Sequence, residues 1–344
     1  MREKIAPIPF RPWMLNGLSE RMVVSHYEND YGSAVRALNA LRGELQALVS
    51  VGASSALIRS LKREELAAMD SIALHELYFA TFGGDGRMTD GAATRLQADF
   101  GSIEAWRDDF MTTAQALRGG SGWAQLSYSH RDRRLYNHGG SETQSLVDAT
   151  PILALDMHEH AYHMDFGANL TAYIDAFMRN VDWKVIENRL VRAEARAPAA
   201  AGEAAETPLP VSFDEATASF DAAEIARLGL PSVTVEELFD TLAEDEKAQV
   251  VDARPRHYFS RNVDMMRTAV WRDPNRIDQW AKELSPDKPV FVYCAYGYHV
   301  GCNVAAALRK RGFDAKYLRG GLSAWYAAGG ERVLKTPDPS AIAV

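Results

Sequence analysis

A segment rich in alanine, glutamate and proline divides this 344-residue chain and limits the folds that it can adopt. From Val191 to Pro210 it reads VRAEARAPAAAGEAAETPLP, which has three prolines and lacks the apolar spacing of a helix or a strand. This composition is typical of a linker between folded units. We therefore predict two globular parts joined by a linker over residues 193–230. The stretch FDAAEIARLGL near its end leaves a short helix open as an alternative.

The two parts differ in the chemistry that their side chains offer. Seven of the nine histidines precede residue 165, whereas both cysteines, Cys294 and Cys302, lie in the later part. Two cysteines cannot build a disulfide framework, and the opening MREKIAPIPF lacks the apolar core of a secretory signal. We therefore expect a cytoplasmic protein. The net charge of −8 argues against nucleic-acid binding, and no apolar run is long enough to span a membrane.

The first part is predicted to hold a helical hairpin over residues 1–85 and an α/β section over residues 86–192. Apolar residues repeat at three- and four-residue spacing in LNALRGELQALVS, as in an amphipathic helix. The stretches GWAQLSYS, RRLYNH and ATPILALD are predicted to be strands. Helices are predicted over residues 18–50, 63–83, 91–98 and 101–117, with further helical patterns over 159–190.

The later part, residues 231–336, is predicted to hold a parallel sheet with helices on its faces. Strands such as AQVVDAR and PVFVYC alternate with the helical segments GCNVAAALRKRGF and GLSAWYAAGG, a pattern typical of parallel α/β domains. In TVEEL, Thr234 is followed three residues later by Glu237. This spacing predicts a capping box at the start of the first helix.

In the stretch ALDMHEHAYHMDF, residues 154–166, eight residues hold five side chains that can bind a metal, Asp156, His158, Glu159, His160 and His163. Asp156 ends an apolar strand, and His160 follows four residues later, so the two side chains can converge. His158 points elsewhere on a helix, and the absence of H-E-x-x-H excludes a zincin. Carboxylate with imidazole suits iron or manganese. His26 and His75, on the two long helices, are the candidates for the other ligands.

Several motifs in residues 8–190 resemble those of the iron/manganese superoxide dismutase family. DMHEHAY is similar to that family's D-x-W-E-H-A-Y, GGSGWAQL to its G-S-G-W-x-x-L strand, and DFGSIEAW and RNVDW to two helix segments. The resemblance implies a helical hairpin followed by an α/β part, and one iron or manganese ion per chain. The implied ligands are His26, His75, Asp156 and His160. It also implies a homodimer in which Glu159 contacts His160 of the partner subunit.

The sequence departs from the family pattern around the ligands, where neighbouring groups tune a metal site. His158 replaces the family's tryptophan, and Ala34 replaces its tyrosine near the substrate funnel. Of the two usual positions of a solvent-binding glutamine, one is Ser71 and the other resembles His138. We therefore expect His138 to contact the solvent bound to the metal, as in some iron-dependent members, which favours iron over manganese.

The resemblance also predicts a contact between subunits that differs from the family pattern. The family's histidine four residues after the first ligand is Asp30 here, and the tyrosine that it meets in the partner chain is His163. We expect Asp30 and His163 to form an exchanged contact. The residues predicted to surround the ligands are His138, His158, Asp30, His163, Glu159, Tyr162 and Trp123.

Residues 232–333 resemble the rhodanese-like sulfurtransferases. VVDAR is similar to their strand with D-x-R, YCAYGYHVG to the C-x-x-G-x-R loop, and YLRGGLSAW to the L-x-G-G-x-x-x-W ending. The resemblance implies that Cys294 carries a persulfide, and a thiol near a helix N-terminus has a lowered pKa. Cys302 fits a buried structural role. The predicted active loop is Ala295, Tyr296, Gly297, Tyr298 and His299, with His299 in place of the usual arginine.

Together these patterns predict a superoxide dismutase with a tethered sulfurtransferase module, acting on small molecules under oxidative stress. One alternative is a dismutase-like metal scaffold with little turnover, coupled to the handling of persulfide or of an oxyanion such as chromate. Another is a different redox enzyme, whose altered metal surroundings act on sulfur or oxyanion substrates. The complete ligand set favours the first interpretation. Ala34, His158 and His299 favour the two alternatives.

Overall fold

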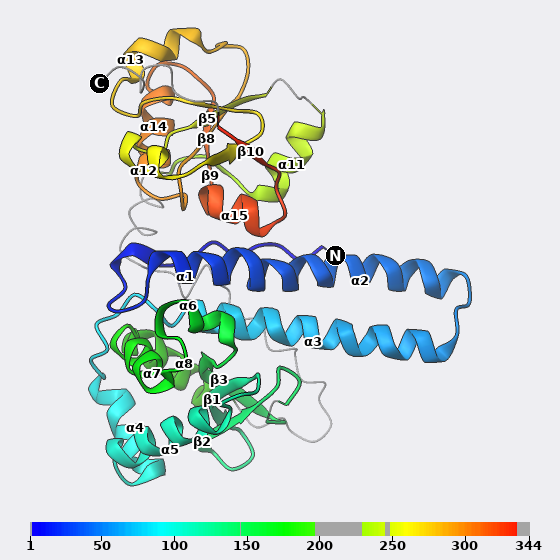
Figure 1. Cartoon of the computed structure of the whole chain (residues 1–344), viewed down its shortest axis with the longest axis vertical. Helices are drawn as coiled ribbons and strands as arrows, with labels where there is room; N and C mark the ends of the chain where they lie inside the picture. Colours follow the sequence, from blue (N-terminus) through cyan, green and yellow to red (C-terminus); the bar gives the residue numbers. More distant parts are fainter. Residues whose placement is uncertain (1, 145, 197–228, 245–247, 336–344) are drawn as a thin grey trace. The chain divides into compact units, whose positions relative to one another are not determined.

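The computed structural model describes residues 2–144, 146–196, 229–244 and 248–335. The chain divides into two compact units, one formed by Pro9–Ser219 and the other by Met1–Ile8 with Phe220–Val344 (Figure 1). Most of the predicted linker, 193–230, and its alternative short helix lie outside the described residues. Among the described helices, none combines the length and the apolar character needed to cross a membrane.

The N-terminal residues differ from the predicted division of the chain. The first helical part was expected to begin at residue 1, but residues 1–8 group with the second unit. One contact that holds them there is the hydrogen bond from the backbone N–H of Ile5 to the Glu236 carboxylate, at 3.2 Å. The side chains of Ile5 and Ile8 are buried, so this segment also contributes apolar surface.

The first unit opens with the predicted helical hairpin, which is not built from two uniform α-helices (Figure 1). The helix expected over 18–50 contains a π-helical turn, and the second helix begins at Ser55 instead of 63 because the Ser54 hydroxyl caps it. The elements are η1 (Pro12–Met14), α1 (Glu20–Ser25), η2 (His26–Tyr31), α2 (Gly32–Ser50) and α3 (Ser55–Phe79).

The rest of the first unit is the predicted α/β section. Its three strands form an antiparallel sheet in the order β2-β1-β3. Thr89 and Ser102 cap the two helices before the sheet with their side-chain oxygens. The elements are α4 (Asp90–Phe100), α5 (Ile103–Ala116), β1 (Trp123–Ser129), β2 (Arg134–Gly140), β3 (Ala149–Asp156), η3 (Glu159–Ala161), α6 (His163–Phe166), α7 (Leu170–Arg179) and α8 (Trp183–Ala195).

Aromatic side chains connect the hairpin to the α/β section. The rings of Tyr78 on α3 and Phe177 on α7 stack with centroids 5.8 Å apart, and the Trp123 ring of β1 meets that of Tyr78 edge-on at 6.3 Å. All three side chains are buried. This packing fixes the end of β3 against the hairpin, so that the two segments carrying candidate ligands meet in one core.

The second unit is the predicted parallel α/β domain. Its five-stranded sheet has the order β4-β9-β8-β5-β7, with β10 and β6 as a separate antiparallel pair. The predicted capping box is confirmed, since Thr234 and Glu237 exchange backbone-to-side-chain hydrogen bonds of 2.8 and 3.2 Å. The elements are β4 (Ser232–Val233), α11 (Val235–Glu244), β5 (Gln249–Asp252), α12 (Arg256–Arg261), β6 (Asp264–Met266), β7 (Ala269–Trp271), α13 (Ile277–Trp280), η4 (Ala281–Glu283), β8 (Val290–Tyr293), α14 (Val300–Arg309), β9 (Ala315–Leu318), α15 (Gly321–Ala327) and β10 (Arg332–Leu334).

Candidate metal centre and thiol site

Four side chains from distant parts of the first unit meet at one point. His26 lies in the π-helical turn, and His75 lies in the last part of α3. Asp156 ends β3, and His160 lies in the short helix η3 that follows. One potential ligand atom from each residue lies within 4.8 Å of the others. The structure thus brings together the four residues that the sequence predicts as ligands.

The three imidazoles direct the same ring atom at one carboxylate oxygen. The Nε2 atoms of His26, His160 and His75 lie 3.0, 3.1 and 3.8 Å from Oδ2 of Asp156. Asp156 is fully buried, and His26 and His75 are nearly so. Such a convergence of nitrogen and oxygen donors, three of them from buried residues, is the geometry of a metal site built from protein ligands.

In His75 and His160, a polar contact at Nδ1 leaves Nε2 as the nitrogen that can bind an ion. Nδ1 of His75 donates a hydrogen bond to the Ser71 carbonyl at 2.8 Å, which leaves the lone pair on Nε2. Nδ1 of His160 lies 3.3 Å from Oδ1 of Asp30. A hydrogen bond on the outer nitrogen is the usual support of a metal-binding histidine.

The protonation and the hydrogen bonding of His26 and His75 show whether the site fits a cation. Burial is the largest influence on His75 and lowers its pKa to about 3, and burial also lowers the pKa of His26. Both rings are therefore neutral near pH 7, as metal ligation requires. Their Nε2 atoms are buried and make no hydrogen bond within the described part of the chain. A cation bound by three imidazoles and one carboxylate would satisfy these atoms, and this donor set fits iron or manganese.

The second oxygen of Asp156 is held by His158, one of the residues predicted to surround the ligands. Nδ1 of His158 donates to Oδ1 of Asp156 at 2.7 Å, and Nε2 lies 3.2 Å from the Glu142 carboxylate. Burial lowers the pKa of His158, but the two carboxylates outweigh it and raise that pKa to about 10. His158 thus links the ligand Asp156 to a half-buried acid, Glu142.

The other residues predicted to surround the ligands are placed as follows. The ring of Trp123 lies 5.0 Å from that of His75, beside the ligands. His138 shares a hydrogen bond of 2.9 Å with the Ser127 hydroxyl. Tyr162 is buried and lies against Tyr173, with ring centroids 5.3 Å apart. Glu159 and His163 are exposed, and their predicted contacts with a partner subunit stay predictions.

Three residues near the centre were not predicted from the sequence. Glu142 holds His158, and the Tyr173 hydroxyl donates to the Asp156 backbone carbonyl at 2.8 Å. Gln125 is fully buried in β1. For Gln125 a signal existed, because a polar residue between apolar neighbours in a predicted buried strand needs a partner. Glu142 follows a strand in a polar stretch, and no spacing pattern links it to His158.

The thiol of Cys294 lies where the sequence predicts it, directly after β8 and before α14. Its side chain is 6% exposed, and its Sγ lies 3.1 Å from the Tyr298 carbonyl. Gly297 has a φ of +76°, and a Cβ there would lie 2.5 Å from the backbone nitrogen of Gly320. Only glycine therefore allows the loop to pack this closely on the chain before α15.

Burial has a larger effect on the pKa of the Cys294 thiol than the surrounding backbone N–H groups have. It raises the pKa of Cys294, although the backbone N–H groups of Tyr296, Gly297, Tyr298 and Gly301 act in the opposite direction. The expected lowering of the pKa is therefore wrong, because the sulfur is removed from water. The four N–H groups nevertheless form a cradle that would favour a sulfur anion once formed.

The D-x-R segment of the second unit supports the fold. The Arg254 guanidinium bonds both carboxylate oxygens of Asp252, at 2.6 to 3.0 Å, and both residues are buried. Cys302 is buried in the apolar core beside the sheet, which agrees with its predicted structural role.

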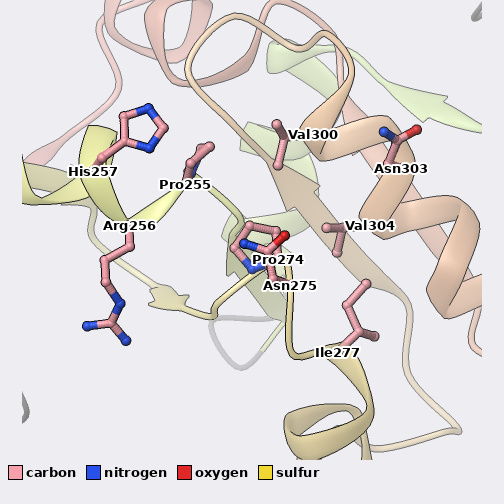
Figure 2. Close-up of a pocket in the computed structure, with 9 residues that line it drawn as sticks. All are labelled: Pro255, Arg256, His257, Pro274, Asn275, Ile277, Val300, Asn303 and Val304. Atoms are coloured by element: carbon pink, nitrogen blue, oxygen red, sulfur yellow. The ribbon is translucent and has the colours of Figure 1, made fainter.

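A pocket of about 660 Å³ lies beside the first turn of α14 (Figure 2). Val300, Asn303 and Val304 line it from α14, and Pro255 and Pro274 line it from two loops. Cys294 is not among the lining residues. The pocket therefore lies beside the active loop and does not enclose the thiol.

Comparison with known proteins agrees with the geometry of the first unit. The chain is 45% identical over 194 residues to an iron superoxide dismutase of Cupriavidus metallidurans, covering 56% of this chain and 98% of that protein. It is 30% identical over 192 residues to an iron superoxide dismutase of Aquifex pyrophilus, covering 53% and 89%. It is also 38% identical over 128 residues to a manganese superoxide dismutase of Halobacterium salinarum, covering 36% and 62%.

Two family models match separate parts of the chain. Residues 88–189 match the C-terminal domain of iron/manganese superoxide dismutases, which includes Asp156 and His160. Residues 234–328 match the rhodanese-like domain, which includes Cys294. With the buried cluster of three histidines and one aspartate, these matches show that the chain belongs to the iron/manganese superoxide dismutase family and carries a rhodanese-like domain after it.

Proposed function

We propose that the first unit dismutates superoxide to dioxygen and hydrogen peroxide at one iron ion per chain. The observation that carries this proposal is the convergence of the Nε2 atoms of His26, His75 and His160 on Oδ2 of Asp156. When bound, iron would supply the one-electron redox chemistry that dismutation requires. His26, His75, Asp156 and His160 would hold it.

The residues of the chain would control orientation and proton supply. Burial opposes the charge of Asp156, but the adjacent imidazoles of His158, His160 and His26 outweigh it and hold the pKa of that carboxyl well below its usual value, so Asp156 keeps its negative charge. His158 holds a proton at Nδ1 against Oδ1 of that ligand. Because Glu142 contacts the other nitrogen of His158, the pair would relay protons from solvent toward the buried centre.

Iron is proposed as the preferred metal. Two of the relatives named above are iron enzymes, including the one with 45% identity, and one is a manganese enzyme. The donor set does not discriminate, because geometry and metal supply decide between these ions more than ligand type does. His138, in the position expected to contact bound solvent, is the feature of this chain that favours iron.

The test is the dismutation rate per bound ion in full-length protein loaded separately with iron and with manganese. A rate constant near about 10⁸–10⁹ M⁻¹ s⁻¹ with iron alone would support both the reaction and the metal. Equal rates with both ions would contradict the preference for iron. A negligible rate at full metal content would overturn the proposal and favour the scaffold interpretation.

A homodimer is also proposed, on the resemblance and on the exposure of Glu159. Glu159 is exposed in η3 next to the ligand His160, so it is free to contact His160 of the partner subunit. Sedimentation of the full chain gives the oligomeric state. Glu159→Ala is expected to weaken the dimer, whereas a wild-type protein that sediments as a monomer would exclude it.

For the second unit we propose transfer of sulfane sulfur through Cys294. The cradle of backbone N–H groups around its Sγ favours this reaction, because it would hold the negative terminal sulfur of a persulfide. The thiolate would attack the sulfane sulfur of a donor persulfide, and the donor would leave as a thiolate. Both cysteines are free thiols in the structure.

Sulfur release from a small-molecule persulfide to cyanide measures this activity in the full chain. Cys294→Ala is expected to abolish it, and Cys302→Ala is the matched control because that thiol lies in the apolar core. Unchanged release from the Cys294→Ala protein would reject sulfur transfer at this loop.

A further inference from the structure

One buried amide in the first unit has no role in the site as described so far. The side chain of Gln125 is 0% exposed, and neither its Oε1 nor its Nε2 makes a hydrogen bond within the described residues. Buried polar groups are nearly always paired, because an unpaired one loses its hydration without compensation. The amide therefore needs a small polar partner within the protein interior.

The strand register places this amide on the side of the sheet that faces the metal ligands. Side chains alternate along a strand, so Gln125 shares a face with Trp123, whose ring lies 5.0 Å from that of the ligand His75. Trp123 pairs with Asp156 on β3, and Gln125 pairs with Ala154. Gln125 thus lies diagonally opposite the ligand Asp156, on the same face of the sheet.

The neighbouring strand adds polar side chains to the same face. Gln125 pairs with His138 on β2, and directly opposed residues have Cβ atoms about 4.5–5.5 Å apart. Nε2 of His138 is engaged with the Ser127 hydroxyl at 2.9 Å, so this ring has a fixed orientation. The three polar groups of this face, Gln125, Ser127 and His138, lie in a sheet whose other buried residues are mainly apolar.

We propose that Gln125 is a positioning residue for the small oxygen ligand of the metal site, whether water, hydroxide or superoxide. Its amide offers two donors and one acceptor, so it can bind a solvent molecule that also contacts His138. This role rests on the proposed function, since it assumes an ion held by the four ligands. The amide would orient the oxygen ligand without binding the ion itself.

Binding of azide to the ferric full-length protein tests this role without measuring turnover. Azide is a small anion that competes for the same position, and its dissociation constant is read from the absorption spectrum. Gln125→Leu keeps the approximate volume and removes every hydrogen bond of the amide. We expect unchanged iron content and an azide dissociation constant that differs from the wild-type value by about 10-fold or more. Mutating residues that surround metal ligands usually has effects of this size.

The matched control is Leu126→Met, on the opposite face of the same strand and equally buried. It perturbs packing by a similar amount and is expected to leave azide binding within twofold of wild type. Azide binding within twofold of wild type in Gln125→Leu would overturn the proposal. If that variant fails to fold, Gln125→Met carries the same test.

The outcome is separable from that of the proposed function. Wild-type protein that binds iron and azide but does not dismutate superoxide would refute the proposed function alone, and the comparison of Gln125→Leu with wild type would still decide the role of the amide. Conversely, rapid dismutation by both proteins with equal azide binding would refute the role of Gln125 alone.

Discussion

The carboxylate of Asp30 lies 3.3 Å from Nδ1 of His160, on the opposite side of the ring from Nε2, which faces Asp156. Asp30 belongs to the π-helical turn that also carries the ligand His26. π-Helical turns are frequent at functional sites, because the extra residue redirects side chains on one face of a helix. Here the turn supplies both a ligand and the group that orients a second ligand within the same chain.

Removing this carboxylate should weaken metal binding. Asp30→Ala leaves Nδ1 of His160 without its acceptor. We therefore expect metal affinity to fall by about 10- to 100-fold, as when other hydrogen-bond partners of metal-binding histidines are removed. Asp30→Asn, which keeps a carbonyl acceptor, should lose less. Competition with a chelator measures the affinity, and Glu44→Ala, at an exposed position on α2, is the control. Wild-type affinity in Asp30→Ala would show that another group, such as Glu159 of a partner subunit, orients the ring.

The stability of the metal-free protein should depend on pH through His158. Its pKa is about 10 in the folded chain and 6.5 in the unfolded chain, so folding is coupled to protonation. This stabilisation is fully present below pH 6.5 and is lost as the pH rises toward 10. Each kcal/mol lost lowers the melting temperature by about 2–4 °C in a unit of this size.

Thermal unfolding of metal-free wild type and His158→Gln at pH 6.5, 8 and 10 measures this effect. The wild type should lose more stability than the variant between pH 6.5 and 10. Glu142→Gln should show an intermediate slope, because it removes one of the two carboxylates that raise the pKa of His158. Equal slopes in all three proteins would rule out a protonated His158 at neutral pH.

The thiol of Cys294 should react slowly near neutral pH. Burial raises its pKa above the ordinary value of 9.0, so little thiolate is present at pH 7.5. Alkylation by iodoacetamide, followed by intact-protein mass spectrometry, should therefore accelerate as the pH rises past 9. In Cys294→Ser only Cys302 remains, whose pKa burial raises to about 12, and labelling should nearly stop. Fast labelling of wild type at pH 7 would mean that the backbone cradle prevails over burial.

Gly297→Ala should disrupt the active loop of the rhodanese-like unit. The new Cβ would lie 2.5 Å from backbone at Gly320, in addition to the cost of a positive φ. Gly312→Ala is the matched control, since its φ is +89° but nothing lies within 4 Å of the added atom. We expect the control to lose about 1 kcal/mol of unfolding free energy and Gly297→Ala to lose at least twice that.

Urea unfolding of the two variants provides the comparison, and sulfur release provides a functional readout. Gly297→Ala should lose sulfur transfer, whereas superoxide dismutation by the first unit should stay as in wild type. Equal stability of both alanine variants would show that the loop moves aside at little cost.

The order of elements and the pair Asp156 and His160 could be predicted from local patterns in the sequence, whereas His26 and His75 were implied as ligands by the family resemblance. Apolar periodicity marks the hairpin, and Thr234 with Glu237 marks a helix start whose capping bonds the structure confirms. The D-x-x-x-H spacing of Asp156 and His160 allows convergence because one follows a strand and the other enters a short helix. Residues 1–8 were assigned to the wrong unit, since a short segment without periodicity carries no sign of its packing partner.

The sequence by itself determined the ligand types, the thiol and the succession of secondary structure, since these follow from residue chemistry and short-range spacing. Only the tertiary structure decided how the groups around the ligands are connected. The partner of His158 is the free oxygen of Asp156, Glu142 reaches His158 from another loop, and the Cys294 thiol has a raised pKa. Hydrogen bonding and desolvation depend on which distant segments pack together, and no local pattern encodes that arrangement.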